Sequence, residues 1–484
     1  MIATSFLCFL GLFVFIGVLS RRYAKPTRRS YLLAGQDVKP WLVGLSAVAT
    51  NNSGYMFIGV IGYTYMTGLP AIWLMIGWIL GDLIASSVVH RRLREASTSA
   101  AGNTFPAILA SWHGQQFKAV RVIGGLITVV FLGTYAAAQL TAGSKALHVL
   151  FGWSESTGAI IGAAMVLAYC LAGGIRASIW TDAAQSIVMI AAMTLILVVG
   201  VASLGGPGTT WQQLNDVSPT YMSLFPQGLA LGDTYGPLLF VVGWLFAGFS
   251  VVGQPHIMVR FMALDHARNI NRARLYYYLW FVAFYFIANA VALISRLLIP
   301  DAGGFDPELA LPTIAVNLLP PVMVGLVLAG IFAATMSTAD SLILSCAGSV
   351  SEDIIELPHK VWITKASTIA VCLFALWLAL SSERSVFDLV VASWAVLAAC
   401  FGPLLTIYAL NQRPTQALAL TMMFTGLISV YVWLQFDVLA DYYEGMLAIC
   451  LGFVVFLIGR ATGFVQDNSA ASTSADDIAE AASG

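Results

Sequence analysis

The stretch GIFAATMSTADSLILSCAGSVSED, residues 330–353, has the length and hydrophobicity of a membrane-spanning helix, yet its middle is polar. Hydrocarbon offers polar side chains no partners, so in membrane helices they normally face a cavity or a pathway. Ser337, Asp340 and Ser341 stand at i, i+3 and i+4, which places them on one face of a helix. Several hydroxyl oxygens beside one carboxylate suit a small hard cation. The stretch therefore predicts the cation site of an ion-coupled transporter. Its polar side chains are Thr335, Ser337, Thr338, Asp340, Ser341 and Ser345.

Each of these hydroxyls, taken singly, has a simpler explanation. Ser and Thr side chains in membrane helices often bond back to their own helix or across to a neighbouring helix. That explanation stays open for any one of them, but it accounts poorly for five hydroxyls around one aspartate.

The composition of the chain is that of an all-α, polytopic membrane protein. Its 484 residues are 59% hydrophobic and only 10% charged, whereas soluble domains carry about 25% charged residues. A net charge of −1 without a long basic run argues against nucleic acid as a partner. The cysteines and histidines show no disulfide or metal-ligand spacing, and no phosphate-binding loop points to ATP-driven transport. No nucleophile–base pair suggests an enzyme.

Hydrophobic runs of about 20 residues predict thirteen membrane spans. In this arrangement all lysines and arginines except Lys145, Arg296 and Arg384 fall on the inner side, as the positive-inside rule requires. The N-terminus is then outside and the C-terminus cytoplasmic. The predicted spans are 2–20, 41–69, 70–89, 119–147, 155–172, 180–204, 235–255, 275–299, 321–350, 363–382, 386–409, 415–435 and 441–461.

Two of the predicted spans are interrupted. The second contains ATNNSGYMFIG (residues 49–59), whose Asn-Asn-Ser-Gly run is a poor helix former. The seventh contains GWLFAGFSVVGQPHI (residues 243–257), with glycines and then Gly-Gln-Pro. Unwound backbone at membrane depth is tolerated where it lines a cavity, and broken helices at equivalent places mark transporter binding sites. Their offset of five spans predicts inverted five-helix repeats, over spans two to six and seven to eleven.

This organisation predicts four segments. Residues 1–38 form a peripheral first helix and an inner basic loop, and residues 39–410 form the transport core. Residues 411–462 form two peripheral helices, and residues 463–484 form a disordered cytoplasmic tail, small, acidic and poor in hydrophobic residues.

Over residues 30 to 410 the chain resembles the sodium:solute symporter family. The resemblance rests on ATNNSG, GGIRASIWTDAAQ, GQPHIMVRFMA, AATMSTADS and WAVLAACFGP. The third and fifth of these are most similar to the sodium/proline subgroup, and STADS is also similar to pantothenate and choline members. The resemblance implies a thirteen-helix, leucine-transporter-like fold that works by alternating access with Na⁺ as the coupling ion.

The resemblance also implies two ion sites. The first would use the carbonyls of Ala49, Asn52 and Ala334 and the hydroxyls of Ser337 and Thr338. The second, present in some members, would use Asp182, Asp340 and Ser341 together with Ser337. Asp182 could equally be a helix N-cap. Two carboxylates at one site repel unless a cation or a proton lies between them, so either a second sodium binds well or one carboxyl stays protonated.

The solute pocket is expected beside the two breaks, at mid-membrane. Aromatic side chains would form its walls, and exposed backbone groups would bind a carboxylate or an amine. Asp82 in the third span is an unexplained carboxylate that could reach Arg91 or water. The expected lining is Asn51, Ser53, Gly54, Tyr55, Tyr135, Gln139, Trp244, Phe249 and Trp394.

Three positions of this pocket depart from the sodium/proline pattern, which resemblance would give as Asp at Asn51, Trp at Ala247 and Tyr at Val251. Tyr135 does match the pattern. The expected function is sodium-coupled import of a small polar solute, with proline or a related amino acid first. The alternatives are pantothenate, a carboxylate or a sugar acid as solute, or a transporter-like sensor. A functional monomer among the lipids of a bacterial inner membrane is expected on family grounds.

Overall fold

A computed structural model describes residues 1–300, 303–355, 357–358, 360–381, 386–436 and 442–466. Their regular structure is helical, and the only β-type pairing in this part of the chain is two isolated bridges. The predicted all-α class is therefore confirmed. Most of the predicted tail lies outside the described residues. The α-helices are α1 Ile2–Ser20, α2 Arg28–Leu33, α3 Pro40–Asn51, α4 Val60–Thr67, α5 Ile72–Ser99, α6 Phe105–Ala110, α7 Lys118–Phe151, α8 Glu155–Ser203, α9 Pro207–Asp216, α10 Gly232–Phe249, α11 Pro255–Met262, α12 Ile270–Leu298, α13 Ala310–Leu318, α14 Pro321–Gly348, α15 Val361–Ser381, α16 Val386–Ala409, α17 Gln416–Trp433 and α18 Gly445–Ala461.

Ten helical segments in the described residues are long and apolar enough to cross a membrane. Two further apolar helices, Glu155–Ala168 and Gly445–Ala461, are shorter. The second predicted span is divided between α3 and α4. The chain is thus an integral membrane protein, while the total of thirteen spans stays a prediction.

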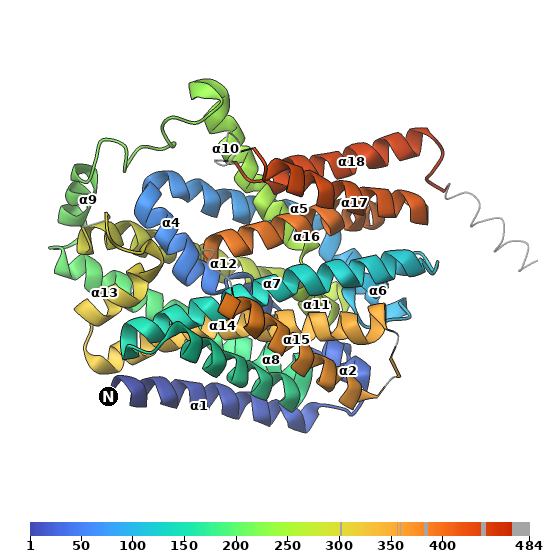
Figure 1. The fold of residues 1–484 in the computed structure, drawn as a ribbon, viewed down its shortest axis with the longest axis horizontal. Coiled ribbons are helices and arrows are strands. Elements are labelled where there is room, and N and C mark those ends of the chain that lie inside the picture. Colours follow the sequence, from blue (N-terminus) through green and yellow to red (C-terminus); the bar gives the residue numbers. More distant parts are fainter. Residues whose placement is uncertain (301–302, 356, 359, 382–385, 437–441, 467–484) are drawn as a thin grey trace, which may run out of the picture.

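The helices form one bundle with α14 near its centre (Figure 1). Figure 1 shows α1 along one edge and α17 with α18 along the opposite edge. In the most apolar stretch of Pro321–Ile354, which contains α14, 83% of the residues are buried. In the most apolar stretch of Ile2–Tyr23, which contains α1, only 22% are buried. Helix α14 packs against α7, α8 and α3. The polar stretch quoted above therefore lies in the interior of the protein and not against lipid.

The segment α8 contains two predicted spans, 155–172 and 180–204, as two helical halves. The halves meet at Gly174, whose φ of 59° and ψ of −147° are not helical, and a left-handed φ of this kind favours glycine. A Cβ at Gly174 would also lie 2.5 Å from the carbonyl oxygen of Tyr31. Asp182 consequently lies inside α8 and not at a helix N-terminus, so the N-cap alternative was wrong.

The predicted seventh span is broken as expected. Helix α10 ends at Phe249, a 3₁₀ turn covers Ser250–Gly253, and α11 begins at Pro255. Helix α10 packs closely on α5. A Cβ at Gly81 of α5 would lie only 1.9 Å from the Leu245 carbonyl oxygen of α10, so there is room only for glycine. Small residues of this kind let membrane helices approach each other. The break itself packs against α16 and α5, and helix α11, which follows it, packs against α3 and α14.

Candidate functional site

The first element of the site is the C-terminal end of α3. Asn52 leaves the helical conformation, with φ −91° and ψ 68°, and a π-helical turn over Tyr55–Gly59 leads into α4. The last carbonyl groups of a helix have no partners within it. Here the break frees the carbonyls of Ala49 and Thr50 in a buried environment.

These carbonyls meet hydroxyl groups of α14. The Ser337 hydroxyl lies 3.2 Å from the Ala49 oxygen and 3.1 Å from the Ala334 oxygen. The Thr338 hydroxyl lies 3.0 Å from the Thr50 oxygen. Both hydroxyls are fully buried. In this arrangement they donate to the carbonyls, and the lone pairs of the same oxygens suit a small hard cation.

Four of the five residues predicted for the first ion site thus lie at one place. Asn52, the fifth, sits at the break, and its side-chain amide donates to the Val48 oxygen at 2.9 Å. Thr50 was not predicted to take part. Its position directly after Ala49 in the same freed turn is the signal that could have indicated it.

The residues predicted for the second ion site also come together. The Asp182 carboxylate accepts a hydrogen bond from Ser46 at 2.6 Å. The Asp340 carboxylate accepts from Ser178 at 2.8 Å and from Ser341 at 2.9 Å. Asp182 is completely buried and Asp340 is 2% exposed. This group of side chains lies next to the first ion site, because the Ser341 hydroxyl donates to the Ser337 carbonyl at 2.5 Å.

A cation was missed among these oxygens. Arg260 of α11 is fully buried and lies 3.3 Å from an Asp182 carboxylate oxygen. From the sequence, Arg260 was predicted only to be one of the positive charges on the inner side. The signal was present in the GQPHIMVRFMA segment, because an arginine so close to a helix break can turn back into the bundle.

Most of the predicted solute-lining residues form one buried group beside the α3 break. The Tyr135 hydroxyl donates to the Ser53 hydroxyl at 2.9 Å, and the Gln139 side-chain oxygen accepts from the Gly54 amide at 2.8 Å. The rings of Tyr135 and Trp394 lie 6.3 Å apart. Tyr55 joins this group through Trp78, whose ring lies 5.9 Å from that of Tyr55 and 5.0 Å from that of Trp394.

The other three predicted lining residues lie apart from this group. Asn51 donates to the Tyr277 hydroxyl of α12 at 2.6 Å. Phe249 packs on Phe453 of α18, with the ring centres 6.0 Å apart. Trp244 lines a separate cavity.

That cavity, which we call the outer cavity, has a volume of about 230 Å³. Aromatic side chains form most of its wall, and one carboxylate, Glu444, faces it. Phe387 lies between this cavity and the buried group beside the α3 break. Its ring stacks on Tyr63 of the cavity wall, with the ring centres 5.1 Å apart, and lies 5.3 Å from the ring of Tyr55 in the buried group. The aromatic lining is Tyr63, Phe240, Trp244, Phe387, Tyr442 and Tyr443.

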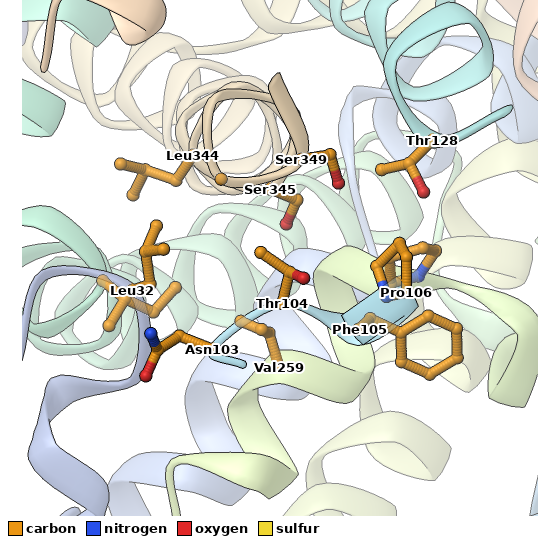
Figure 2. A pocket seen from close by; sticks show the side chains of 13 residues that line it. Leu32, Asn103, Thr104, Phe105, Pro106, Thr128, Val259, Leu344, Ser345 and Ser349 are labelled. Atoms are coloured by element: carbon orange, nitrogen blue, oxygen red, sulfur yellow. The ribbon is translucent and has the colours of Figure 1, made fainter. Parts of the chain in front are cut away.

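A much smaller cavity lies along α14 on the other side of the ion sites (Figure 2). Its volume is about 20 Å³, which is room for about one water molecule. Figure 2 shows Ser345 and Ser349 on one side and Thr104, Phe105 and Pro106 on the other. The cavity is therefore too small for an organic solute in this structure.

Asp82 does not reach Arg91, and neither of its carboxylate oxygens has a hydrogen-bond partner among the described residues. Arg91, the partner suggested by the sequence, pairs with Glu95 at 2.9 Å instead. Asp82 is fully buried beside Tyr277, Tyr278 and Arg274 of α12. Through Tyr277 it lies next to Asn51, and hence next to the α3 break.

Comparison with known proteins gives a consistent result. The model of the Sodium:solute symporter family matches residues 31–426. A sodium/proline symporter of Escherichia coli (strain K12) is 30% identical over 93% of this chain and 91% of that protein. The high-affinity proline transporter PutP of Bacillus subtilis (strain 168) is 31% identical over 83% of this chain and 86% of that protein.

Two solved structures share the fold. A Na⁺-coupled sialic acid symporter, in a substrate-bound outward-open state, has a TM-score of 0.79 at 18% identity, over 95% of this chain and 96% of that one. The nucleobase-cation-symport-1 family transporter Mhp1 has a TM-score of 0.60 at 14% identity, over 91% of this chain and 96% of that one. The leucine-transporter-like fold is thereby established.

Proposed function

Because the chain belongs to the sodium:solute symporter family, we propose that it imports L-proline, or a closely related amino acid, by alternating access. The family makes it a transporter and not an enzyme, with sodium as the coupling ion. Proline is the first choice of solute because relatives about 30% identical over most of the chain are named as proline transporters.

The observation that carries the proposal is the meeting of α3 and α14. The freed Ala49 carbonyl and the Ser337 hydroxyl lie 3.2 Å apart on two different elements. A sodium ion bound by Ala49, Asn52, Ala334, Ser337 and Thr338 would hold α14 against the α3 break. A ligand shifts a conformational equilibrium only through its different affinities for the two states. Sodium would therefore favour the state in which these elements are in contact and the solute is accepted from outside.

The solute would bind next to this ion. The buried group of Ser53, Gly54, Tyr55, Tyr135, Gln139 and Trp394 offers hydroxyl, amide and aromatic surfaces for a small zwitterion. We expect Asn51, Trp244 and Phe249 to contact the solute only in other conformations of the cycle. The Asp182, Asp340 and Ser341 set is where a second sodium would bind, unless the buried Arg260 guanidinium already supplies the positive charge there.

The family and the distribution of positive charges support a membrane location and an orientation for the protein. We propose a bacterial inner membrane, with the N-terminus outside, the C-terminus cytoplasmic and a functional monomer surrounded by lipid. The outer cavity then faces the outside, and the cavity of Figure 2 faces the cytoplasm.

A different solute is the second candidate, supported by the departures from the sodium/proline pattern. Ala247 and Val251 are fully buried at the α10–α11 break, where larger side chains would change the pocket. Pantothenate, a carboxylate or a sugar acid would then replace proline, with the sodium site unchanged.

Uptake of radiolabelled L-proline into proteoliposomes tests the proposal. We expect accumulation with an inward sodium gradient and none with an equal choline gradient. If proline fails to accumulate while sodium still raises the melting temperature of the purified protein, the solute is wrong and the ion site stands. Binding of solute without accumulation would instead indicate a sensor.

A further inference from the structure

The second group of oxygens surrounds an arginine. The Arg260 Nη2 atom donates to the Ser178 hydroxyl at 2.7 Å and to the Asp182 carboxylate at 3.3 Å. It also contacts the Ser341 hydroxyl. The Nη1 atom donates to the His256 carbonyl at 2.8 Å. The guanidinium is thus held by oxygens of α8, α11 and α14 and has no exposure to solvent.

The charges explain why an arginine is tolerated there. Two buried carboxylates, Asp182 and Asp340, lie on α8 and α14, and both bond to hydroxyls that also contact the guanidinium. An uncompensated charge in such a place is very unfavourable. Arginine stays protonated under all ordinary conditions and provides several donors in a fixed geometry. It therefore supplies the positive charge that the carboxylates require.

We infer that Arg260 is the built-in cation of the second ion site. Its guanidinium holds the position among Ser178, Asp182 and Ser341 that a second sodium would otherwise take. To bind there, sodium would have to displace several charge-assisted hydrogen bonds, which are about twice as strong as neutral ones. The inference rests on the proposed function, and its consequence is that one sodium, at the first ion site, drives each cycle.

The Asp182–Asp340–Arg260 group lies beside the first ion site, since Ser341 bonds both to Asp340 and to the Ser337 carbonyl. Among the described residues, the Asp182 Oδ1 atom has no hydrogen-bond partner. Charge interactions act strongly at this range in a buried environment. Arg260 thus sets how much negative charge the first sodium experiences.

Equilibrium binding of ²²Na⁺ to the purified full-length protein tests the inference. We expect one sodium per chain for the wild type. Arg260→Gln removes the built-in cation, so we expect the number of bound sodium ions to double. Arg260→Lys keeps a positive charge and is expected to bind one. Arg94→Gln is the matched control, because Arg94 is another buried arginine, which donates to the carbonyls of Leu264 and Asp265. It is expected to bind one ion as well.

The outcomes separate this inference from the proposed function. Two sodium ions on the wild type, or still only one on Arg260→Gln, would overturn the inference and leave sodium symport intact. No sodium on the wild type would overturn both. If Arg260→Gln does not fold, Arg260→Ala, which removes the same charge with a smaller side chain, is counted in its place.

Discussion

At the residue scale, the proposed sodium binding at the first ion site depends on two hydroxyl groups of α14. Ser337→Ala and Thr338→Ala each remove one ligand oxygen from the first ion site. A hydrogen bond to a charged group contributes about 1.5–3 kcal/mol, so we expect the sodium concentration for half-maximal uptake to rise at least about tenfold. The measurement is uptake at a fixed solute concentration over a range of sodium concentrations.

Ser345→Ala is the matched control for these variants. Ser345 is a serine of the same helix, and its buried hydroxyl has no hydrogen-bond partner in the described part of the chain. We expect its sodium dependence to equal that of the wild type. Unchanged sodium dependence in both Ser337→Ala and Thr338→Ala would rule out the assigned site.

We expect Glu444 to make the rate of uptake depend on pH. Burial, with a smaller effect of the Asp388 charge, raises the pKa of this carboxyl to about 7. The group is therefore neutral below pH 7 and negative above it. A negative carboxylate among the aromatic rings of the outer cavity attracts an ammonium group, so we expect uptake at low solute concentration to increase from pH 6 to pH 8.

The Glu444→Gln variant checks the origin of this effect. Asp388, Tyr442 and Tyr443 are the other titratable groups near Glu444. The variant leaves them in place, so its uptake should stay flat between pH 6 and pH 8. A pH profile identical to that of the wild type would show that another group titrates.

At the element scale, the α3 break depends on close packing at Gly54. A Cβ there would lie 2.6 Å from the Thr335 Cγ2 atom of α14 and 3.0 Å from the Ala142 Cβ of α7. We expect Gly54→Ala to push α3 from α14, to lower the melting temperature and to weaken sodium binding. Overpacking of this kind costs about 1–3 kcal/mol.

A second substitution tests that explanation. Thr335→Ser removes the methyl group in the shorter contact and keeps the hydroxyl. The double variant Gly54→Ala/Thr335→Ser should recover part of the lost stability and sodium affinity. No recovery would mean that Gly54 matters for its backbone conformation and not for space.

The π-helical turn that follows α14, Ser349–Ile354, is held by buried charges. The Asp353 carboxylate accepts from Thr104 at 2.7 Å and from Arg121 at 3.1 Å. These bonds tie the C-terminal end of α14 to the segment before α6 and to α7, beside the cavity of Figure 2. Asp353→Asn weakens them by removing a charge. We expect the variant to open this end more often.

A cysteine placed in that cavity measures the opening. Ser345→Cys, in a background without the six native cysteines, should react with a soluble thiol reagent. We expect Asp353→Asn to increase the rate about tenfold, the factor that corresponds to about 1.4 kcal/mol. Glu95→Gln breaks an exposed pair and should leave the rate unchanged. Equal rates in all three proteins would exclude a gating role for Asp353.

At the scale of the whole molecule, the hydrophobic pattern was sufficient to predict the helical class, and the Asn-Asn-Ser-Gly and Gly-Gln-Pro runs predicted the two breaks. The spans 155–172 and 180–204 were predicted as separate helices, and the chain does leave the helical conformation between them, at Gly174. Helix periodicity placed Ser337 and Thr338 on one polar face of their span. The family resemblance implied that this face meets the α3 break, and the structure places them there. The position of Arg260 could not be predicted in this way, because a charge near a predicted span end can point to solvent or into the bundle. Phe249 shows the same limit, since aromatic side chains beside a break can face another helix.

We propose that a sodium ion joins the α3 break to the middle of α14. Hydrogen–deuterium exchange of the purified protein in sodium and in potassium tests this most directly. Sodium should slow exchange in peptides covering residues 49–54 and 334–341 together, and potassium should not. Protection of neither segment, or protection confined to other helices, would contradict the account.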